Sequence, residues 1–133
     1  MAELSNVRKL HQGIDIVGVS KQFHTKNGTI QALGEINLHV RSQEFLTLVG
    51  TSGCGKSTLL RIIGGLEGTS TGNVYFKQQR IEGPGAERGM VFQSYTLFPW
   101  LTIRQNIQFG LEQKKSMGKE EMEEIARRYI DLV

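Results

Sequence analysis

The feature that most constrains this chain is a glycine-rich segment that reads Gly50-Thr51-Ser52-Gly53-Cys54-Gly55-Lys56-Ser57-Thr58. It matches the pattern G-x-x-x-x-G-K-[S/T], which is typical of a phosphate-binding P-loop. The glycines permit backbone torsions closed to other residues, so successive N–H groups can surround an anion. We expect Lys56 to reach the β- and γ-phosphates of a nucleotide and the Ser57 hydroxyl to ligate Mg²⁺. The predicted nucleotide-binding residues of the loop are Gly50, Ser52, Gly53, Cys54, Gly55, Lys56, Ser57 and Thr58.

The residues on either side of the loop support this interpretation. A short, mostly apolar run at 45–49 precedes it, as a buried parallel strand would. After the loop, Leu and Ile recur at helical spacing until Gly64-Gly65, which can end a helix. This order predicts a strand, the loop and then a helix whose positive N-terminal end faces the phosphates. The alternative is a glycine-rich turn that matches the pattern by accident.

Composition places the chain among globular proteins. Its 133 residues suffice for one domain with a modest core, and 38% of them are apolar. The net charge of +3 comes with no basic patch interleaved with aromatic residues, so nucleic acid is not an expected partner. The single cysteine, Cys54, excludes an internal disulfide and is interpreted as a small filler of the loop. No stretch approaches the length of a membrane span, so a membrane role would require a partner.

Alternating and apolar runs predict the strands. Residues 14–23 form a first candidate strand, and Asn27-Gly28 is a hairpin signal that leads into a short run at 30–32. Apolar residues alternate with polar ones over 36–40, which favours a half-buried antiparallel strand. Two further strand-like runs lie at 74–76 and 90–92.

Two helices are predicted in the last third of the chain. Thr102 followed by Gln105 fits a capping box, ahead of an apolar stripe at 103, 107 and 111. The last helix has favourable i,i+4 charge pairs from Glu123 and Glu124 to the arginines at 127 and 128. It reaches Val133 without a capping residue, where we would not expect a domain to end. Its apolar face comprises Met122, Ile125, Ala126, Tyr129, Ile130 and Val133.

A second motif indicates which family of P-loop proteins the chain resembles. From Met90 the chain reads MVFQSYTLFPWLT, and with the P-loop this resembles the ATP-binding-cassette (ABC) transporter ATPases over about residues 14–133. The resemblance implies an α/β P-loop NTPase core with a mixed sheet of N-terminal antiparallel strands, the P-loop strand and helices. It also implies that Gln93 touches Mg²⁺ and the attacking water, a role that a neutral amide can perform. The alternative for Gln93 is a strand-end glutamine bonded to backbone.

The same resemblance implies that Phe23 occupies the position where the family stacks an aromatic ring on adenine. A phenyl ring is sufficient for such stacking. The alternative is an ordinary core aromatic. The stretch 83–89 together with Pro99-Trp100-Leu101-Thr102 is similar to the nitrate/sulfonate/taurine-type importers. In that case Phe98-Pro99-Trp100 would dock a helix of a transmembrane permease subunit, whereas local packing is the alternative.

The resemblance also indicates what this chain lacks. Neither aspartate, Asp15 or Asp131, is followed by glutamate, no Leu-Ser-Gly-Gly signature is present, and no histidine lies beyond His39. We therefore expect residues 1–133 to be the N-terminal part of one nucleotide-binding domain, ending before the signature and Asp-Glu motifs. Such a chain should be aggregation-prone, and should bind Mg-ATP weakly with little or no turnover.

The expected partners are a permease and a second ATP-binding subunit, with the protein on the cytoplasmic face of the cell membrane. Two other interpretations stay open at this point. One is another P-loop enzyme, a GTPase or small-molecule kinase, although no Asn-Lys-x-Asp guanine reader occurs. The other is a truncated remnant without function.

Overall fold

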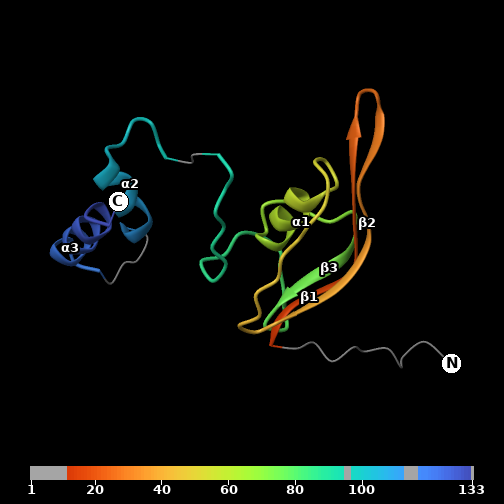
Figure 1. The fold of residues 1–133 in the computed structure, drawn as a ribbon, viewed down its shortest axis with the longest axis horizontal. Helices are drawn as coiled ribbons and strands as arrows, with labels where there is room; N and C mark the ends of the chain where they lie inside the picture. Colours follow the sequence, from red (N-terminus) through yellow and green to blue (C-terminus); the bar gives the residue numbers. More distant parts are fainter. Residues whose placement is uncertain (1–11, 95–96, 113–116, 133) are drawn as a thin grey trace. The chain divides into compact units, whose positions relative to one another are not determined.

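The computed structural model describes residues 12–94, 97–112 and 117–132, which form two compact units divided after Met90. The first unit contains a four-stranded antiparallel sheet in the order β2-β1-β3-β4 (Figure 1). Its strands are β1 (Gly13–Thr25), β2 (Gly28–Arg41), β3 (Thr71–Phe76) and β4 (Gln79–Arg80). The strands predicted at 14–23, 36–40 and 74–76 are confirmed.

β1 and β2 form a long hairpin, as the Asn27-Gly28 signal predicts. The two-residue turn is Lys26-Asn27, because Thr25 pairs with Gly28 across it. β2 runs without a break from Gly28 to Arg41, so the two runs predicted at 30–32 and 36–40 belong to one strand. A second tight hairpin joins β3 to β4 through Lys77 and Gln78, which both have positive φ angles, of 48° and 70°. That hairpin has no Gly or Asn to announce it in the sequence.

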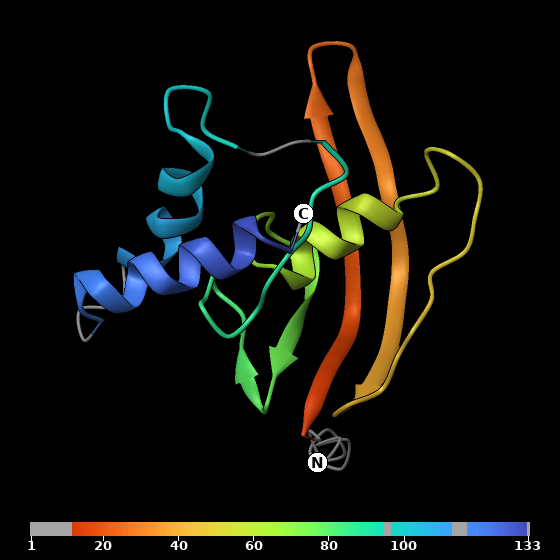
Figure 2. The same cartoon turned by 60° about the vertical axis from the view of Figure 1, so that its left-hand side comes forward.

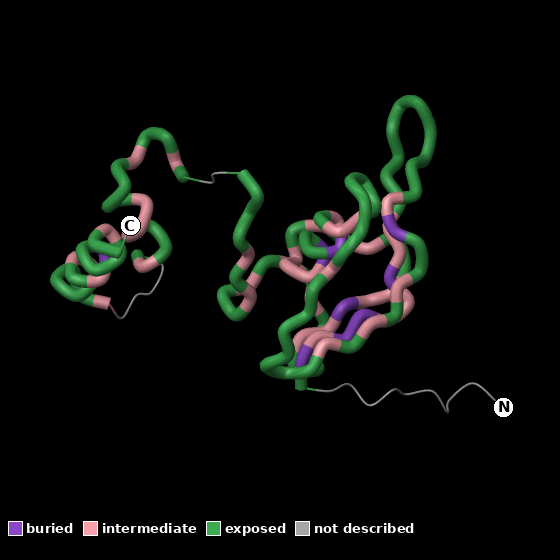
Figure 3. The backbone as a smooth tube through the Cα atoms, viewed as in Figure 1, coloured by how far each residue is buried: buried purple, intermediate pink, exposed green. Residues whose placement is uncertain are grey.

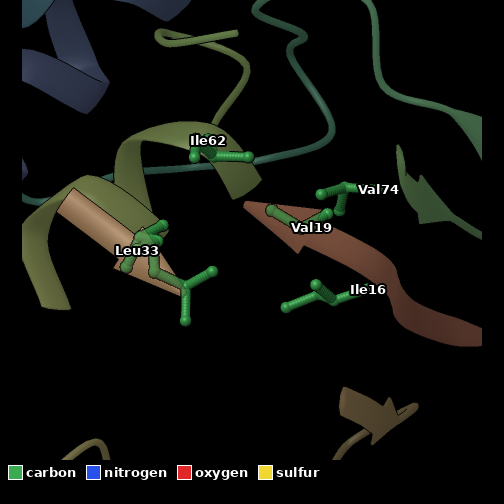
Figure 4. Packing of buried hydrophobic residues seen from close by; sticks show 6 residues of the cluster. Ile16, Val19, Leu33, Ile62 and Val74 are labelled. Carbon is green, nitrogen blue, oxygen red and sulfur yellow. The ribbon is translucent and has the colours of Figure 1, made fainter. Parts of the chain in front are cut away.

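The helix α1 (Lys56–Ile63) lies across one face of this sheet (Figure 2). Leu59 and Ile62 are its buried residues, and Ile62 faces Val19 and Val74 of the sheet (Figure 4). Burial of each such aliphatic side chain contributes about 1.5–3 kcal/mol. The helix ends where predicted, because Gly64 caps it and Gly65 adopts a φ angle of 74°. The buried core comprises Ile16, Val19, Leu33, Leu59, Ile62 and Val74.

Two predicted strands are not formed. Residues 45–49 and 90–92 have no strand conformation, and Figure 3 shows most of 44–54 exposed. The side chains of Phe45, Val49 and Val91 are 94%, 90% and 97% exposed. An apolar run becomes a strand only when neighbouring strands satisfy its backbone groups, and the described residues provide no such neighbour here. The prediction of a P-loop strand is therefore wrong for this chain, although the α/β class is confirmed.

The second unit pairs α2 (Ile103–Glu112) with α3 (Lys119–Ile130). The predicted capping box is present, since the Thr102 N–H donates to Gln105 Oε1 at 2.8 Å and the Gln105 N–H to Thr102 Oγ1 at 3.2 Å. Ala126 is fully buried on the apolar face of α3, whereas Tyr129 is exposed and Val133 lies outside the described residues. Glu123 pairs with Arg104 of α2, and not with the arginine four residues on as predicted.

Candidate functional site

The P-loop spans residues 50–55 and leads directly into α1. Gly53 and Gly55 have φ angles of 80° and 96°, a region that glycine adopts at little cost. A Cβ atom on Gly55 would lie 2.5 Å from Leu33 Cδ2 and 2.6 Å from the Ala32 carbonyl oxygen, both in β2. The loop therefore rests directly on β2, and the glycine at position 55 is required for both reasons.

The N-terminal end of α1 is left open to an anion. Its N-cap residue, Gly55, has no side chain that could accept a hydrogen bond, and the first turn contains no acidic residue. The first backbone bond of the helix runs from the Leu59 N–H to the Gly55 carbonyl at 2.9 Å. The amides before it and the positive end of the helix dipole are thus available for a negatively charged ligand.

Lys56 is folded back onto the loop. Its Nζ donates to the carbonyl oxygens of Gly50 at 2.7 Å and Thr51 at 2.8 Å, and lies 3.3 Å from Cys54 Sγ. The ammonium group therefore sits inside the ring of loop residues, held by neutral acceptors. Phosphate oxygens carry full charge and would make stronger bonds to the same group.

The remaining predicted loop residues differ in how far they are exposed. Ser52, Cys54 and Ser57 are exposed, and Thr58 is half-buried in the first turn of α1. A Cβ on Gly50 would lie 2.6 Å from Cys54 Sγ, so the thiol packs tightly against the start of the loop. Loop amides, one ammonium group and a hydroxyl at the second helix position form a donor set that fits a nucleotide phosphate with Mg²⁺.

Phe23 lies in the same unit, in the part of β1 that pairs with β2, the strand on which the P-loop rests. It pairs with Ile30 of β2, close along that strand to the Ala32 and Leu33 atoms that touch Gly55. Its side chain is 37% exposed and does not belong to the buried core. This placement agrees better with a ring available to a ligand than with a core aromatic, and adenine stacking stays a prediction.

Gln93 belongs to the second unit, where it is exposed in a segment without helix or strand. Its predicted contact with Mg²⁺ and water stays a prediction. Near it in sequence, Phe98 is half-buried and packs against the tilted ring of Phe109, with ring centroids 4.6 Å apart. Trp100 is 75% exposed. Local packing thus accounts for Phe98, while Trp100 remains open to a partner.

The described residues contain no candidate for a metal cluster or for a membrane-spanning helix. Within residues 12–94, 97–112 and 117–132 no cluster of three or more His, Cys, Asp or Glu side chains could hold a metal ion. Asp15 is buried, and its carboxylate lies 2.8 Å from His39 Nδ1. None of the described helices has the length and apolar character needed to cross a membrane.

One charged residue beside the candidate site was missed by the sequence reasoning. Lys21 has a side chain only 12% exposed, and its Nζ lies 4.8 Å from the centre of the Phe23 ring. The same Nζ lies 2.5 Å from Glu67 Oε1. The hydrogen bond from Lys21 holds the pKa of Glu67 below its usual value, so this carboxylate is charged at neutral pH. In the sequence, the signal that could have indicated this contact is the spacing of two residues between Lys21 and Phe23.

Comparison with known proteins identifies the family to which the chain belongs. Residues 33–132 match the family described as ABC transporter. A nitrate import ATP-binding protein of Synechocystis sp. is 47% identical over 90% of this chain and 45% of its own length. An aliphatic sulfonates import ATP-binding protein of Bacillus cereus is 42% identical over 84% of this chain and 44% of its own. The chain thus spans about half the length of the curated relatives it matches, at their N-terminal part.

A solved structure of an ATP-binding cassette has a similar fold. The ATP-binding cassette MJ0796, in a dimeric post-hydrolysis state bound to ADP and Pi, superimposes with a TM-score of 0.76 at 31% identity. The superposition covers 86% of this chain and 54% of that one. The predicted fold class is therefore confirmed as part of such a cassette.

Proposed function

Because this chain belongs to the ABC transporter family, we propose that it binds Mg-ATP at the P-loop as part of the ATP-binding subunit of a solute importer. The observation that carries the proposal is the open N-terminal end of α1 with Lys56 enclosed by the loop. On binding, Lys56 exchanges the Gly50 and Thr51 carbonyls for phosphate oxygens. The loop amides would hold the phosphate chain and Ser57 would ligate the Mg²⁺ ion, a role that the family resemblance also assigns to Gln93.

The solute is a small anion in this proposal. Relatives named for nitrate, aliphatic sulfonate and bicarbonate transport support that class. The exposed Trp100, together with Leu97 three residues before it at 62% exposure, would contact the permease subunit. A second ATP-binding subunit completes the dimer, which the dimeric state of the solved MJ0796 cassette supports. The subunit would then act at the cytoplasmic face of the membrane, attached through its permease.

The 133-residue chain alone is proposed to bind nucleotide without sustained hydrolysis. Its sequence contains neither an Asp-Glu pair after an apolar run nor a Leu-Ser-Gly-Gly signature. Hydrolysis of ATP needs a group that polarises water and groups that stabilise the transferred phosphoryl, and these motifs normally supply them.

Calorimetric titration with Mg-ATP tests the binding step. Lys56→Ala should weaken binding by roughly tenfold or more, since a hydrogen bond to a charged group contributes about 1.5–3 kcal/mol. Lys119→Ala removes an equal charge from the exposed first turn of α3 and should leave the affinity unchanged. Equal loss in both variants, or no binding by the folded unaltered chain, would refute the proposal. Phosphate release over many turnovers that depends on Lys56 would refute the hydrolysis part alone.

A further inference from the structure

The side chain of Lys21 connects β1 to the segment that follows α1. It lies in β1 opposite Leu33 of β2, and its ammonium group donates to Glu67 Oε1 at 2.5 Å and to the Gly68 carbonyl at 2.8 Å. Both acceptors lie in the segment that follows α1. An ammonium group has three donors, and two of them are directed to these oxygens. The Phe23 ring, at 4.8 Å, lies within the range of a cation–π contact.

The ammonium group is held firmly in this place. Its side chain is 12% exposed, and an ionised carboxylate offsets its charge. Pairing and hydrogen bonding offset the cost of removing most of this charge from water. The contact with Phe23 therefore restrains the ring, whose side chain is otherwise 37% exposed on the surface.

A purely structural role accounts for only part of this arrangement. The segment after α1 is already tied to β1 by two other bonds, from the Ser70 N–H to the Ser20 carbonyl at 2.8 Å and from the Gln22 N–H to Ser70 Oγ at 2.9 Å. The ion pair with Glu67 strengthens that tie. Neither bond involves the Phe23 ring, which lies beside the ammonium group because side chains two residues apart in a strand share a face.

We propose that Lys21 is a positioning residue for the base of the bound nucleotide, which holds the Phe23 ring by one face and leaves the rest of the ring for adenine to stack on. The inference rests on the proposed function, because it needs a nucleotide in the P-loop. The register supports it, since Lys21 pairs with Leu33, the residue that Gly55 of the loop touches. A ring ordered before binding loses less side-chain freedom when the base arrives.

The test separates base binding from phosphate binding. Affinities for Mg-ATP and for magnesium tripolyphosphate are measured by calorimetry on the 133-residue chain, and their ratio reports the contribution of the nucleoside. Lys21→Met should lower this ratio about two- to fivefold, the lower part of the range for ordering one side chain on binding. Tripolyphosphate affinity should stay unchanged. Lys21→Arg keeps a cation and should keep the ratio of the unaltered chain.

A double-mutant cycle with Phe23→Leu tests whether Lys21 acts through the Phe23 ring or only by tying the segment after α1 to β1. Lys21→Met should have no further effect on the ratio once the ring is absent. Glu67→Gln keeps an acceptor and the lysine, so it should change the ratio less than twofold. If Lys21→Met does not fold, Lys21→Gln takes its place, because its amide can still bond Glu67 without a charge.

Three results would overturn the inference. One is an equal effect of Lys21→Met with and without the Phe23 ring, and another is an equal loss of affinity for both ligands. The third is a ratio of one in the unaltered chain, which would refute base stacking while the P-loop assignment stands. Failure of the unaltered folded chain to bind even tripolyphosphate would instead overturn the proposed function and this inference together.

Discussion

The clearest quantitative test of the P-loop geometry is Gly55→Ala. The residue has a φ angle of 96°, and a left-handed conformation costs a non-glycine residue about 1–2 kcal/mol. The new methyl group would also lie 2.6 Å from the backbone oxygen of Ala32, which cannot move as a side chain does. Overpacking of this kind costs about 1–3 kcal/mol. The two terms together predict a loss of about 2–5 kcal/mol in the free energy of unfolding.

Two other glycines provide matched controls. Gly53 has a φ angle of 80° but nothing within 4 Å of an added Cβ, so Gly53→Ala should show the conformational term alone, about 1–2 kcal/mol. Gly89 has neither a positive φ angle nor a neighbour within 4 Å, so Gly89→Ala should change stability by less than about 0.5 kcal/mol.

Urea unfolding followed by circular dichroism measures all three variants. The single tryptophan, Trp100, lies in the other unit, so its fluorescence would not report on the sheet. With a slope of about 1–3 kcal/mol per molar urea, Gly55→Ala should lower the midpoint by about 1 M or more. Equal destabilisation by Gly53→Ala and Gly55→Ala would refute the contact with β2. No destabilisation by either would refute the positive φ angles.

Three further outcomes are expected. The hydrogen bond from Lys21 lowers the pKa of Glu67, so the stabilisation from this carboxylate is fully present above its ordinary pKa of 4.5 and is lost as the pH falls through the lowered folded value. Urea midpoints of the unaltered chain and Glu67→Gln should therefore converge progressively as the pH falls below 4.5, and a constant difference would contradict this. Thr102→Ala should reduce the stability of α2 by about 0.5–2 kcal/mol, measured by amide hydrogen exchange in the helix, and unchanged exchange would count against the capping box. Alkylation of Cys54, whose thiol lies 3.3 Å from Lys56 Nζ, should block Mg-ATP binding in calorimetry, and bound nucleotide should slow the labelling; normal binding by fully alkylated protein would refute this.

The features predicted correctly from sequence are those that depend on nearby residues. Gly64-Gly65 ended α1 as expected, and the capping box at Thr102 and Gln105 has the hydrogen bonds its spacing implies. The hairpin at Asn27-Gly28 was found for the same reason, since its bonds join residues three positions apart. In each case the chain contains both partners within a few residues, so a local pattern is enough.

The family assignment also came from sequence, through the P-loop and the motif around Gln93. It required no knowledge of where the side chains lie, because the order and spacing of the residues already restrict the chemistry. The comparisons then confirmed the family and the α/β class.

Tertiary structure decided the rest. Whether 45–49 becomes a strand depends on neighbouring strands far away in sequence, and the described residues supply none, so an apolar run that resembles a strand is exposed. The contact of Lys21 with Phe23 and Glu67 spans 46 residues at its longest, from β1 to the segment after α1. Such contacts form because folding brings distant segments together, and the order of residues along the chain specifies them only through the complete packing of the unit.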